Sequence, residues 1–377
     1  MKITGNRVVL NLSGNKMQHV EAGDFISHLR TFQGGLELAH QSGKVSPAYT
    51  VVAPRDGVTV SYFKYVFKSE GYIAQIASVT DQLRDGQSMR YPEFNQTWLP
   101  LPPPVEQKQI ADYLDHETAE IDAFIQDLQR FAQLSAERME SVIDDIIHGS
   151  EAPVTQLRRM KPIRTSGTSV NGEARPAELH ELGVLKTGAA SKGKFDPSEN
   201  KAVTDPKEIG RLTGLVESNR VLVNRANTPD LVGSAVFVDQ EVSNLFLSDK
   251  LWSIDFDGSN QFVSLALSTR SYREQISTFS VGASSSMQNL SYEDFLRIEI
   301  PMPPVLEQEK MAGMALSQIH KMRSLRQDID KAIAIARVRR AALITAAVTG
   351  QIDVTAKNKP AAEQLDDDIA QGLHKES

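Results

Sequence analysis

Two long stretches of the chain carry apolar residues at a spacing of seven, which is typical of helices that pair along a seam. In residues 106–148 the seam includes Leu114, Ile121, Leu128 and Val142, with polar breaks at Thr118 and Ser135. In residues 307–349 it includes Met322, Ile329, Ala336 and Leu343. A seam of this kind buries its apolar side chains against a second helix. The pattern therefore predicts two long helices.

These two stretches are copies of one segment, 201 positions apart and without a gap. Each copy follows a proline cluster, at Pro100 and Pro301, and each continues to a glycine, Gly149 or Gly350. Internal repetition at so long a period indicates a tandem of whole domains. We therefore expect two similar halves, each with its own helix, in a protein that contacts two targets at a fixed separation.

The two predicted helices carry opposite net charge. Residues 106–148 hold 3 basic and 11 acidic side chains, whereas residues 307–349 hold 8 basic and 4 acidic ones. Opposite charges beside an apolar seam favour pairing of the two helices with each other. The alternative is that each helix packs only on its own domain. Because a helix of this length spans roughly 65 Å, more than a small domain's diameter, we favour pairing.

Between the two helices the pattern changes to short alternating runs bounded by turn residues. Three such runs, 220–224, 234–238 and 251–255, predict strands. A helix is expected at residues 262–279 and a final strand at residues 295–300. This region is therefore expected to mix helices and strands.

Residues 1–99 match this plan only in part. The segment 20–26 resembles 216–222, but only 19 residues precede Val20, whereas 65 lead from Glu151 to Val216. We expect the first domain to lack its leading part, either through truncation of the chain or because the domain is a reduced version.

Composition narrows the class of protein. A length of 377 residues suits two or three domains, and a hydrophobic content of 40% suits real cores. The chain has no cysteine, which excludes disulfides and thiolate metal sites and suits a reducing cytoplasm. No apolar run is long enough for a membrane span. The expectation is a soluble cytoplasmic protein.

The net charge is −7, but its distribution is uneven. Residues 158–225 hold 13 basic and 8 acidic side chains, and residues 226–300 hold 4 and 10. This division fits a protein that places positive charge at one surface, and it also fits chance.

Motifs for catalysis are missing from the sequence. It has no phosphate-binding Gly-x-x-x-x-Gly-Lys-Ser/Thr loop and no Asn/Asp-Pro-Pro-aromatic tetrapeptide. Its eight histidines include no His-x-x-x-His pair for a helical metal site. These observations favour a binding or scaffolding protein over an enzyme.

The second copy resembles the specificity subunit of type I restriction–modification systems. The features that carry the resemblance are the proline-rich strand end and Glu-Gln at 300–308, and the helix end Ala-Ala-Val-Thr-Gly-Gln-Ile-Asp-Val at 346–354. Residues 222–228, with Val232 and Gly233, resemble the middle of that family's target-recognition domains. The first helix departs from the pattern at its end, residues 146–150. The resemblance covers the chain up to Val354.

The resemblance implies an α+β fold, with two mixed α/β target-recognition domains separated by two long helices that pair as an antiparallel coiled coil. The expected boundaries are 1–99 for the first domain, 100–150 for the first spacer helix, 151–300 for the second domain, 301–354 for the second helix and 355–377 for a disordered acidic tail.

The function implied by the resemblance is that of a non-enzymatic subunit. Such a subunit binds double-stranded DNA at a split, asymmetric site and carries the methyltransferase and restriction subunits. The chain itself would bind no cofactor and no membrane, and its partner subunits would use S-adenosylmethionine, ATP and magnesium. Two alternatives stay open. One is a truncated subunit that reads a single half-site, and the other is a coiled-coil scaffold without DNA affinity.

Residues that could contact DNA gather in three polar loops. Amide and guanidinium groups bind base edges, and lysines bind phosphates. The loops are 186–194, 224–228 and 284–289, although ordinary solvated loops have similar composition. The candidates in the first two loops are Lys186, Lys192, Lys194, Asn224, Arg225, Asn227 and Thr228. In the first domain, His28 and Arg30 occupy the corresponding place.

Overall fold

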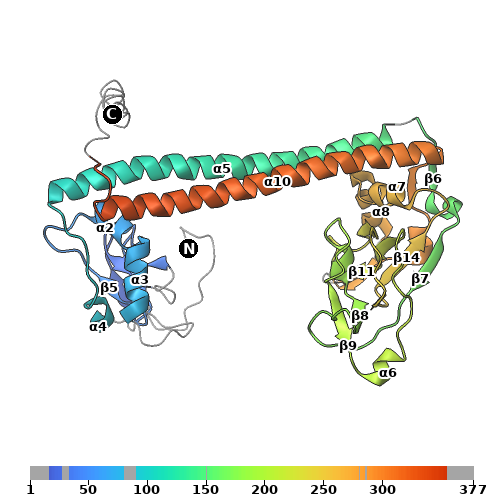
Figure 1. Cartoon of the computed structure of the whole chain (residues 1–377), viewed down its shortest axis with the longest axis horizontal. Coiled ribbons are helices and arrows are strands. Elements are labelled where there is room, and N and C mark those ends of the chain that lie inside the picture. Colours follow the sequence, from blue (N-terminus) through green and yellow to red (C-terminus); the bar gives the residue numbers. More distant parts are fainter. Residues whose placement is uncertain are drawn as a thin grey trace, which may run out of the picture. The chain divides into compact units, whose positions relative to one another are not determined.

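The structure is a computed structural model that describes residues 17–27, 34–79, 91–149, 151–279, 281–284 and 287–354 (Figure 1). The chain divides into two compact units. Unit 1 comprises Met1–Arg130 and Asp328–Ser377, and unit 2 comprises Phe131–Gln327. Each unit therefore holds one globular domain and one part of each long helix. The fold class is α+β, as the sequence predicted.

Both predicted long helices are present. They are α5, Pro104–His148, and α10, Val305–Val348, and each continues without a break through the boundary between the units. Prolines precede both helices because a proline at the first turn removes no intrahelical hydrogen bond. At the end of α10, Gly350 takes a positive φ of 73°, which only glycine adopts without strain.

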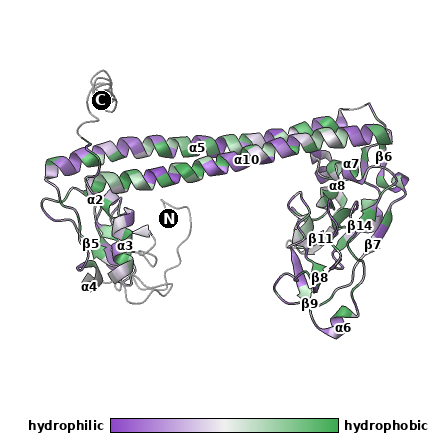
Figure 2. Cartoon of the chain, viewed as in Figure 1, coloured by the Kyte–Doolittle hydropathy of each residue, from purple (hydrophilic) through white to green (hydrophobic). Residues whose placement is uncertain are grey.

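The two helices run antiparallel within each unit. In unit 1, Arg340 of α10 donates a hydrogen bond from Nη2 to Asp122 Oδ2 of α5, at 3.1 Å. In unit 2, late residues of α5 and early residues of α10 line one surface groove, among them Ile146, Lys310 and Met314. Figure 2 shows hydrophobic and hydrophilic residues alternating along both helices, as a coiled-coil seam requires.

The seam positions are buried to different degrees. In α5, Leu114, Thr118, Ile121, Ile125, Ala132 and Ile143 are buried. The predicted seam residues Leu128 and Val142 are only half-buried. Thr118 enters the seam despite its hydroxyl because that group donates to the Leu114 carbonyl at 2.6 Å. In α10 the buried members include Ile329, Ile333, Ala336 and Ile344.

Unit 2 is built on a four-stranded antiparallel sheet. Its order is β12 (Ala235–Phe237), β10 (Val221–Asn224), β14 (Leu251–Asp255), β7 (Ile163–Ser166). All four residues of β10 are buried because both faces of the sheet are covered. Val221 and Val223 point to one cluster and Leu222 to another, as the two-residue period of a strand dictates.

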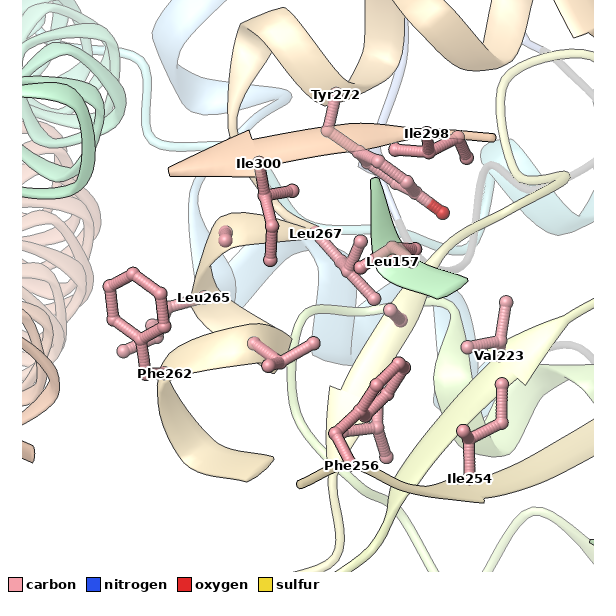
Figure 3. Close-up of a cluster of buried hydrophobic side chains, with 14 of the residues drawn as sticks. Leu157, Val223, Ile254, Phe256, Phe262, Leu265, Leu267, Tyr272, Ile298 and Ile300 are labelled. Atoms are coloured by element: carbon pink, nitrogen blue, oxygen red, sulfur yellow. The ribbon is translucent and has the colours of Figure 1, made fainter. Parts of the chain in front are cut away.

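The first of these clusters lies against the short helices α7 (Asn260–Ala266), α8 (Arg270–Phe279) and α9 (Tyr292–Phe295). Figure 3 shows part of it, with Val223 and Ile254 from the sheet and Phe262 and Leu265 from α7. The cluster also takes in Ile147 of α5 and Ala312 of α10. The long helices of unit 2 are thus fixed to its globular domain by a shared core.

The described residues of unit 2 also form three smaller sheets. They have the orders β13-β8-β9, β11-β16-β15 and β17-β6. Their strands are β6 (Val154–Gln156), β8 (Leu182–Leu185), β9 (Asn200–Val203), β11 (Ala226–Asn227), β13 (Leu245–Phe246), β15 (Val281–Ser284), β16 (Met287–Asn289) and β17 (Glu299–Pro301). The remaining short helices are η2 (Leu157–Met160), η3 (Thr187–Ala190) and α6 (Pro206–Ile209).

Two predictions about unit 2 were inaccurate. The single helix expected at 262–279 is broken into α7 and α8, because Thr269 caps a new helix by accepting a hydrogen bond from the Tyr272 amide. The strand expected at 295–300 begins later, at Glu299, because residues 292–295 form the turn of helix α9. The three predicted strands at 220–224, 234–238 and 251–255 are present as β10, β12 and β14.

Unit 1 repeats the central part of this plan. Strand β2 (Phe25–Ile26) pairs with β3 (Glu37–Leu38) and β5 (Val51–Val52), just as β10 pairs with β12 and β14. Helices α2 (Val60–Val66), α3 (Glu70–Val79) and α4 (Tyr91–Phe94) correspond to α7, α8 and α9. A separate pair joins β1 (Gln18–Val20) to β4 (Gly43–Val45). The described residues of unit 1 include no counterpart of β6 to β9.

The core of unit 1 is rich in aromatic residues. Tyr62, Phe63 and Phe67 are at most 3% exposed and pack with Leu114 of α5 and Val348 of α10. The Tyr62 hydroxyl donates to the carbonyl of Val348 at 3.2 Å. That bond satisfies one of the carbonyls that a helix end leaves open, and it fixes the end of α10 to the globular domain.

Candidate nucleic-acid interface

The described parts of the three loops selected from the sequence meet at one end of β10 in unit 2. Strand β11 follows β10 directly and pairs with β16, with Asn227 opposite Gln288. The first loop, which contains η3, is joined to the end of β10 by hydrogen bonds of Asn224. Segments that lie far apart in the sequence therefore form one surface.

Asn224 has a different position from the one that the sequence suggested. Its side chain is fully buried, and Nδ2 donates to the Thr187 carbonyl at 3.1 Å, to Ser191 Oγ at 3.2 Å and to Ser234 Oγ at 2.7 Å. A buried amide with these partners cannot reach a base edge. We therefore correct its assignment. Asn224 holds the lysine-containing loop on the sheet, and it is a positioning residue for that loop.

Arg225 is half-buried beside the turn that precedes β14. Its Nη1 donates to the Asp249 carbonyl at 3.3 Å, and its Nε is buried without a hydrogen-bond partner in the described part of the chain. The backbone of Arg225 also bonds to Lys250 and Leu290. The Nε donor is therefore unsatisfied but closed to solvent, and backbone hydrogen bonds fix the residue in the wall of the surface.

Asn227 and Thr228 lie at the exposed end of this surface. Asn227 is half-buried and its Oδ1 accepts from the Thr228 amide at 2.8 Å, while Thr228 is exposed. Thr228 also begins a turn, because its carbonyl accepts from the amides of Leu231 and Val232. Arg273 of α8 holds this turn through carbonyls, with Nη1 donating to Val232 at 2.6 Å. These hydrogen bonds therefore stabilise the turn that follows Asn227 and Thr228.

The lysines of the first loop differ in exposure. The side chain of Lys192 is 71% exposed, with Nζ 3.8 Å from Glu199 Oε1, and Lys194 is also exposed. Lys186 is half-buried. The Ser198 hydroxyl, aided by the Ser198 amide and the lysine charges, lowers the pKa of nearby Asp196. Lys192 and Lys194 are therefore the two members of the loop that are best placed to meet a phosphate.

Two further lysines belong to this surface and were not selected from the sequence. Lys201 of β9 and Lys250 are exposed, and both line a pocket of about 200 Å³ together with Lys186, Thr187 and Asp249. The strand period gives a signal for Lys201, because it alternates with buried Asn200 and Ala202. Nothing in the sequence brings Lys250 to the same place, since it follows β9 by about fifty positions.

The counterparts proposed for the first domain, His28 and Arg30, lie outside the described residues. The structure therefore places seven of the nine candidates, all in unit 2. Six of these keep some exposure at one surface and Asn224 does not.

The described residues contain no group of three or more His, Cys, Asp or Glu side chains that could hold a metal ion. Among the same residues, no helix is both long and apolar enough to cross a membrane. The chemistry that the surface offers is hydrogen bonding and positive charge.

Comparison with known proteins finds one similar curated sequence and several solved structures with a similar fold. No family model matches the chain. Over 132 residues the sequence is 30% identical to the type I restriction enzyme EcoEI specificity subunit of Escherichia coli. The match covers 34% of this chain and 22% of that protein, so it spans less than a quarter of the relative's length.

Solved structures extend the likeness in fold to most of the chain. One similar chain comes from a solved structure that is described as showing the structural basis of complex assembly and conformational transition of the type I R-M system. It is 13% identical, covers 89% of this chain and 84% of that chain, and has a TM-score of 0.70. Another is the HsdS subunit from Thermoanaerobacter tengcongensis, with 14% identity, 91% and 84% coverage and a TM-score of 0.51. At such identities the likeness concerns the fold.

Proposed function

Because this chain is related to the specificity subunits of type I restriction–modification systems, we propose that it is the DNA-recognition subunit of such a complex and not an enzyme. The observation that carries the proposal is the sequence relationship to a specificity subunit, joined to a fold shared over most of the chain. The internal duplication supports it as well, since each copy pairs a globular domain with part of the long helices.

The surface at the end of β10 is the proposed contact with double-stranded DNA in unit 2. Its exposed lysines suit phosphates, and its amide and guanidinium groups suit base edges. Lys192 and Lys194, together with the added Lys201, would hold the backbone, while Arg225 and Asn227 would approach the bases. Thr228 is a further phosphate contact by its exposed hydroxyl.

The finer details of this function are also proposals. Each unit would read one half of a split, asymmetric site, and the paired helices would act as the spacer between the half-sites. Methyltransferase and restriction subunits would assemble on the chain. This chain would bind no cofactor, while the partner subunits would use S-adenosylmethionine, ATP and magnesium.

Footprinting tests the proposal directly. The full chain is combined with the methyltransferase subunit and its preferred DNA, and protection from cleavage is mapped along both strands. Two protected patches separated by an unprotected gap are the expected result. Absence of specific protection, with the complex intact by size-exclusion chromatography, would favour a scaffold without DNA affinity and would refute the proposal.

A second candidate function rests on a specific observation. The described residues of unit 1 include no counterpart of β8, η3 and β9, which carry Lys186 to Lys201 in unit 2. A subunit that reads one half-site only would fit this difference. It would give a single protected patch in the same experiment.

A further inference from the structure

Unit 1 contains an apolar groove that its equivalent in unit 2 does not leave open. The groove has a volume of about 540 Å³. Its lining includes Val52, Phe63, Phe67, Phe94, Leu99 and Leu101. A groove of this size with an apolar lining suits large apolar side chains.

In unit 2 the same place is filled by the segment that follows α5. There β6 pairs with β17, and the next residues, in η2, insert Leu157 and Met160, which are 0% and 2% exposed. They join the cluster of Val263, Leu267 and Phe295. Because α7 corresponds to α2 and α9 to α4, these three residues occupy the places of Phe63, Phe67 and Phe94. Figure 3 shows Leu157 within this cluster, close to Leu267.

Residues 98–100 of unit 1 correspond to β17, the strand that receives β6 in unit 2. The Glu299 amide donates to Gln275 Oε1 at 2.8 Å, and the Trp98 amide donates to Gln75 Oε1 at 2.9 Å. Residues 97–101 therefore have the same support from α3 that β17 has from α8. Within the described part of unit 1, however, residues 97–101 form no strand and pair with none.

The rim of the groove is unusually apolar. Trp98 is 85% exposed and Leu101 is 66% exposed, whereas the repeat places the charged residue Glu299 at the position of Trp98. Exposed tryptophan beside an apolar pocket is typical of surfaces that bind another protein. An unpaired strand edge offers main-chain hydrogen bonds to an added strand.

We propose that this groove binds a segment of a partner protein, which adds a strand along residues 98–100 and continues in a helical turn, where it inserts two large apolar side chains three positions apart, as β6 and η2 do in unit 2. The spacing comes from Leu157 and Met160, which fill the equivalent place in unit 2. This proposal goes beyond DNA recognition and does not depend on it.

The chain's own continuation after α10 does not supply this pattern. Val354 is buried in the core of unit 1, next to the groove-lining residues. In the register of the repeat, the positions of Leu157 and Met160 fall on Asn358 and Ala361. Neither residue offers the large apolar side chain that the groove would bury, so this continuation is not the occupant that we propose.

A synthetic peptide of residues 151–166 is the probe, because it carries the segment that fits the equivalent place. Its matched control is the same peptide with Leu157→Asp and Met160→Asp. Fluorescence anisotropy measures binding to the full chain, and the emission of Trp98 reports its burial, since the other tryptophan, Trp252, is already 3% exposed. We expect the control peptide to bind at least about tenfold more weakly and the native peptide to shift Trp98 emission to the blue.

A groove variant tests the location. Leu101→Asp should weaken binding at least about fivefold. Leu306→Asp, at an 80% exposed position of α10 in unit 2, should leave binding unchanged. Both positions are exposed, and circular dichroism checks that each variant stays folded.

Two outcomes would overturn the proposal. The first is equal binding of native and control peptides, both to the full chain and to a chain that starts at Met17. The second is tight binding only to the chain that starts at Met17, which would mean that the chain's own first sixteen residues compete for the groove.

Discussion

Gln107 and Gln308, 201 positions apart, make equivalent buried hydrogen bonds at the first turns of α5 and α10. Gln107 Oε1 accepts from the Thr59 amide at 2.8 Å, and Gln308 Oε1 accepts from the Ser259 amide at 3.0 Å. Thr59 and Ser259 are the residues that precede α2 and α7.

The other end of each amide binds the proline cluster. Gln107 Nε2 donates to the Pro102 carbonyl, and Gln308 Nε2 donates to the Pro303 carbonyl, both at 2.8 Å. Each glutamine is at most 2% exposed. One buried amide therefore joins a long helix, its leading turn and a short helix of the same unit, and the repeat has kept this joint in both halves.

Replacing Gln308 by leucine should destabilise unit 2. The change keeps the volume but leaves the Ser259 amide and the Pro303 carbonyl without partners, so we expect the free energy of unfolding to fall by about 2–4 kcal/mol. Urea titration followed by Trp252 fluorescence measures it. Gln327→Leu, at an exposed position of α10, is the control, and an equal loss in both variants would contradict the joint.

The pair Asp122 and Arg340 should show measurable coupling between the helices in unit 1. Their side chains are 46% and 35% exposed, so the attraction is screened and we expect a coupling of about 0.5–1 kcal/mol. A double-mutant cycle with Asp122→Ala and Arg340→Ala measures it. Additive effects of the two changes would show that the pair contributes nothing to pairing.

Gly233→Ala should lower the stability of unit 2. Gly233 has a φ of +76°, and an added Cβ would lie 2.6 Å from Ile276 Cδ1. We expect a loss of about 1–3 kcal/mol in the free energy of unfolding. Gly313→Ala is a contrasting control, because its Cβ would meet nothing within 4 Å and alanine is the better helix former by about 1 kcal/mol. Thermal melting should move the two variants in opposite directions.

Glu181 should make the stability of unit 2 depend on pH in acid. Bidentate hydrogen bonds from Arg175, at 2.6 and 2.8 Å, lower the pKa of Glu181 to about 2 from its ordinary value of 4.5. Because the folded-state pKa is the lower one, the stabilisation is fully present above pH 4.5 and is lost as the pH falls towards 2.

The Glu181→Gln variant lacks this contribution at every pH. Its melting temperature should therefore lie below that of the native protein at pH 7, and the difference should shrink between pH 4.5 and pH 2. Melting curves over this range measure it. A difference that stays constant with pH would show that the carboxylate charge is not the cause.

Removing two exposed lysines should weaken DNA binding without changing its sequence preference. Phosphate contacts release counterions, so Lys192→Ala with Lys194→Ala should reduce the slope of log affinity against log salt by about 1.8. Gel-shift titrations at several salt concentrations give both quantities. Lys207→Ala, at an exposed position of α6, is the matched control, and an equal effect there would indicate a nonspecific charge effect.

The sequence alone determined the repeat and the long helices. A seven-residue apolar period and a proline at the start are local properties, so α5 and α10 could be placed within two residues of their ends. The strands β10, β12 and β14 were predicted for the same reason, since alternation is visible within a few residues. The loop at 224–228 was expected directly after a strand, and it follows β10.

Tertiary structure decided what each polar side chain does. Asn224 looked like Asn227 in the sequence, but packing of η3, 37 positions away, buries the one and leaves the other half-exposed. Packing of distant segments also brings Lys250 and Lys186 to one pocket. It likewise places Leu157 in unit 2 where the equivalent groove of unit 1 stays open. Burial and proximity depend on which distant segments pack together, and a local pattern holds no information about that choice.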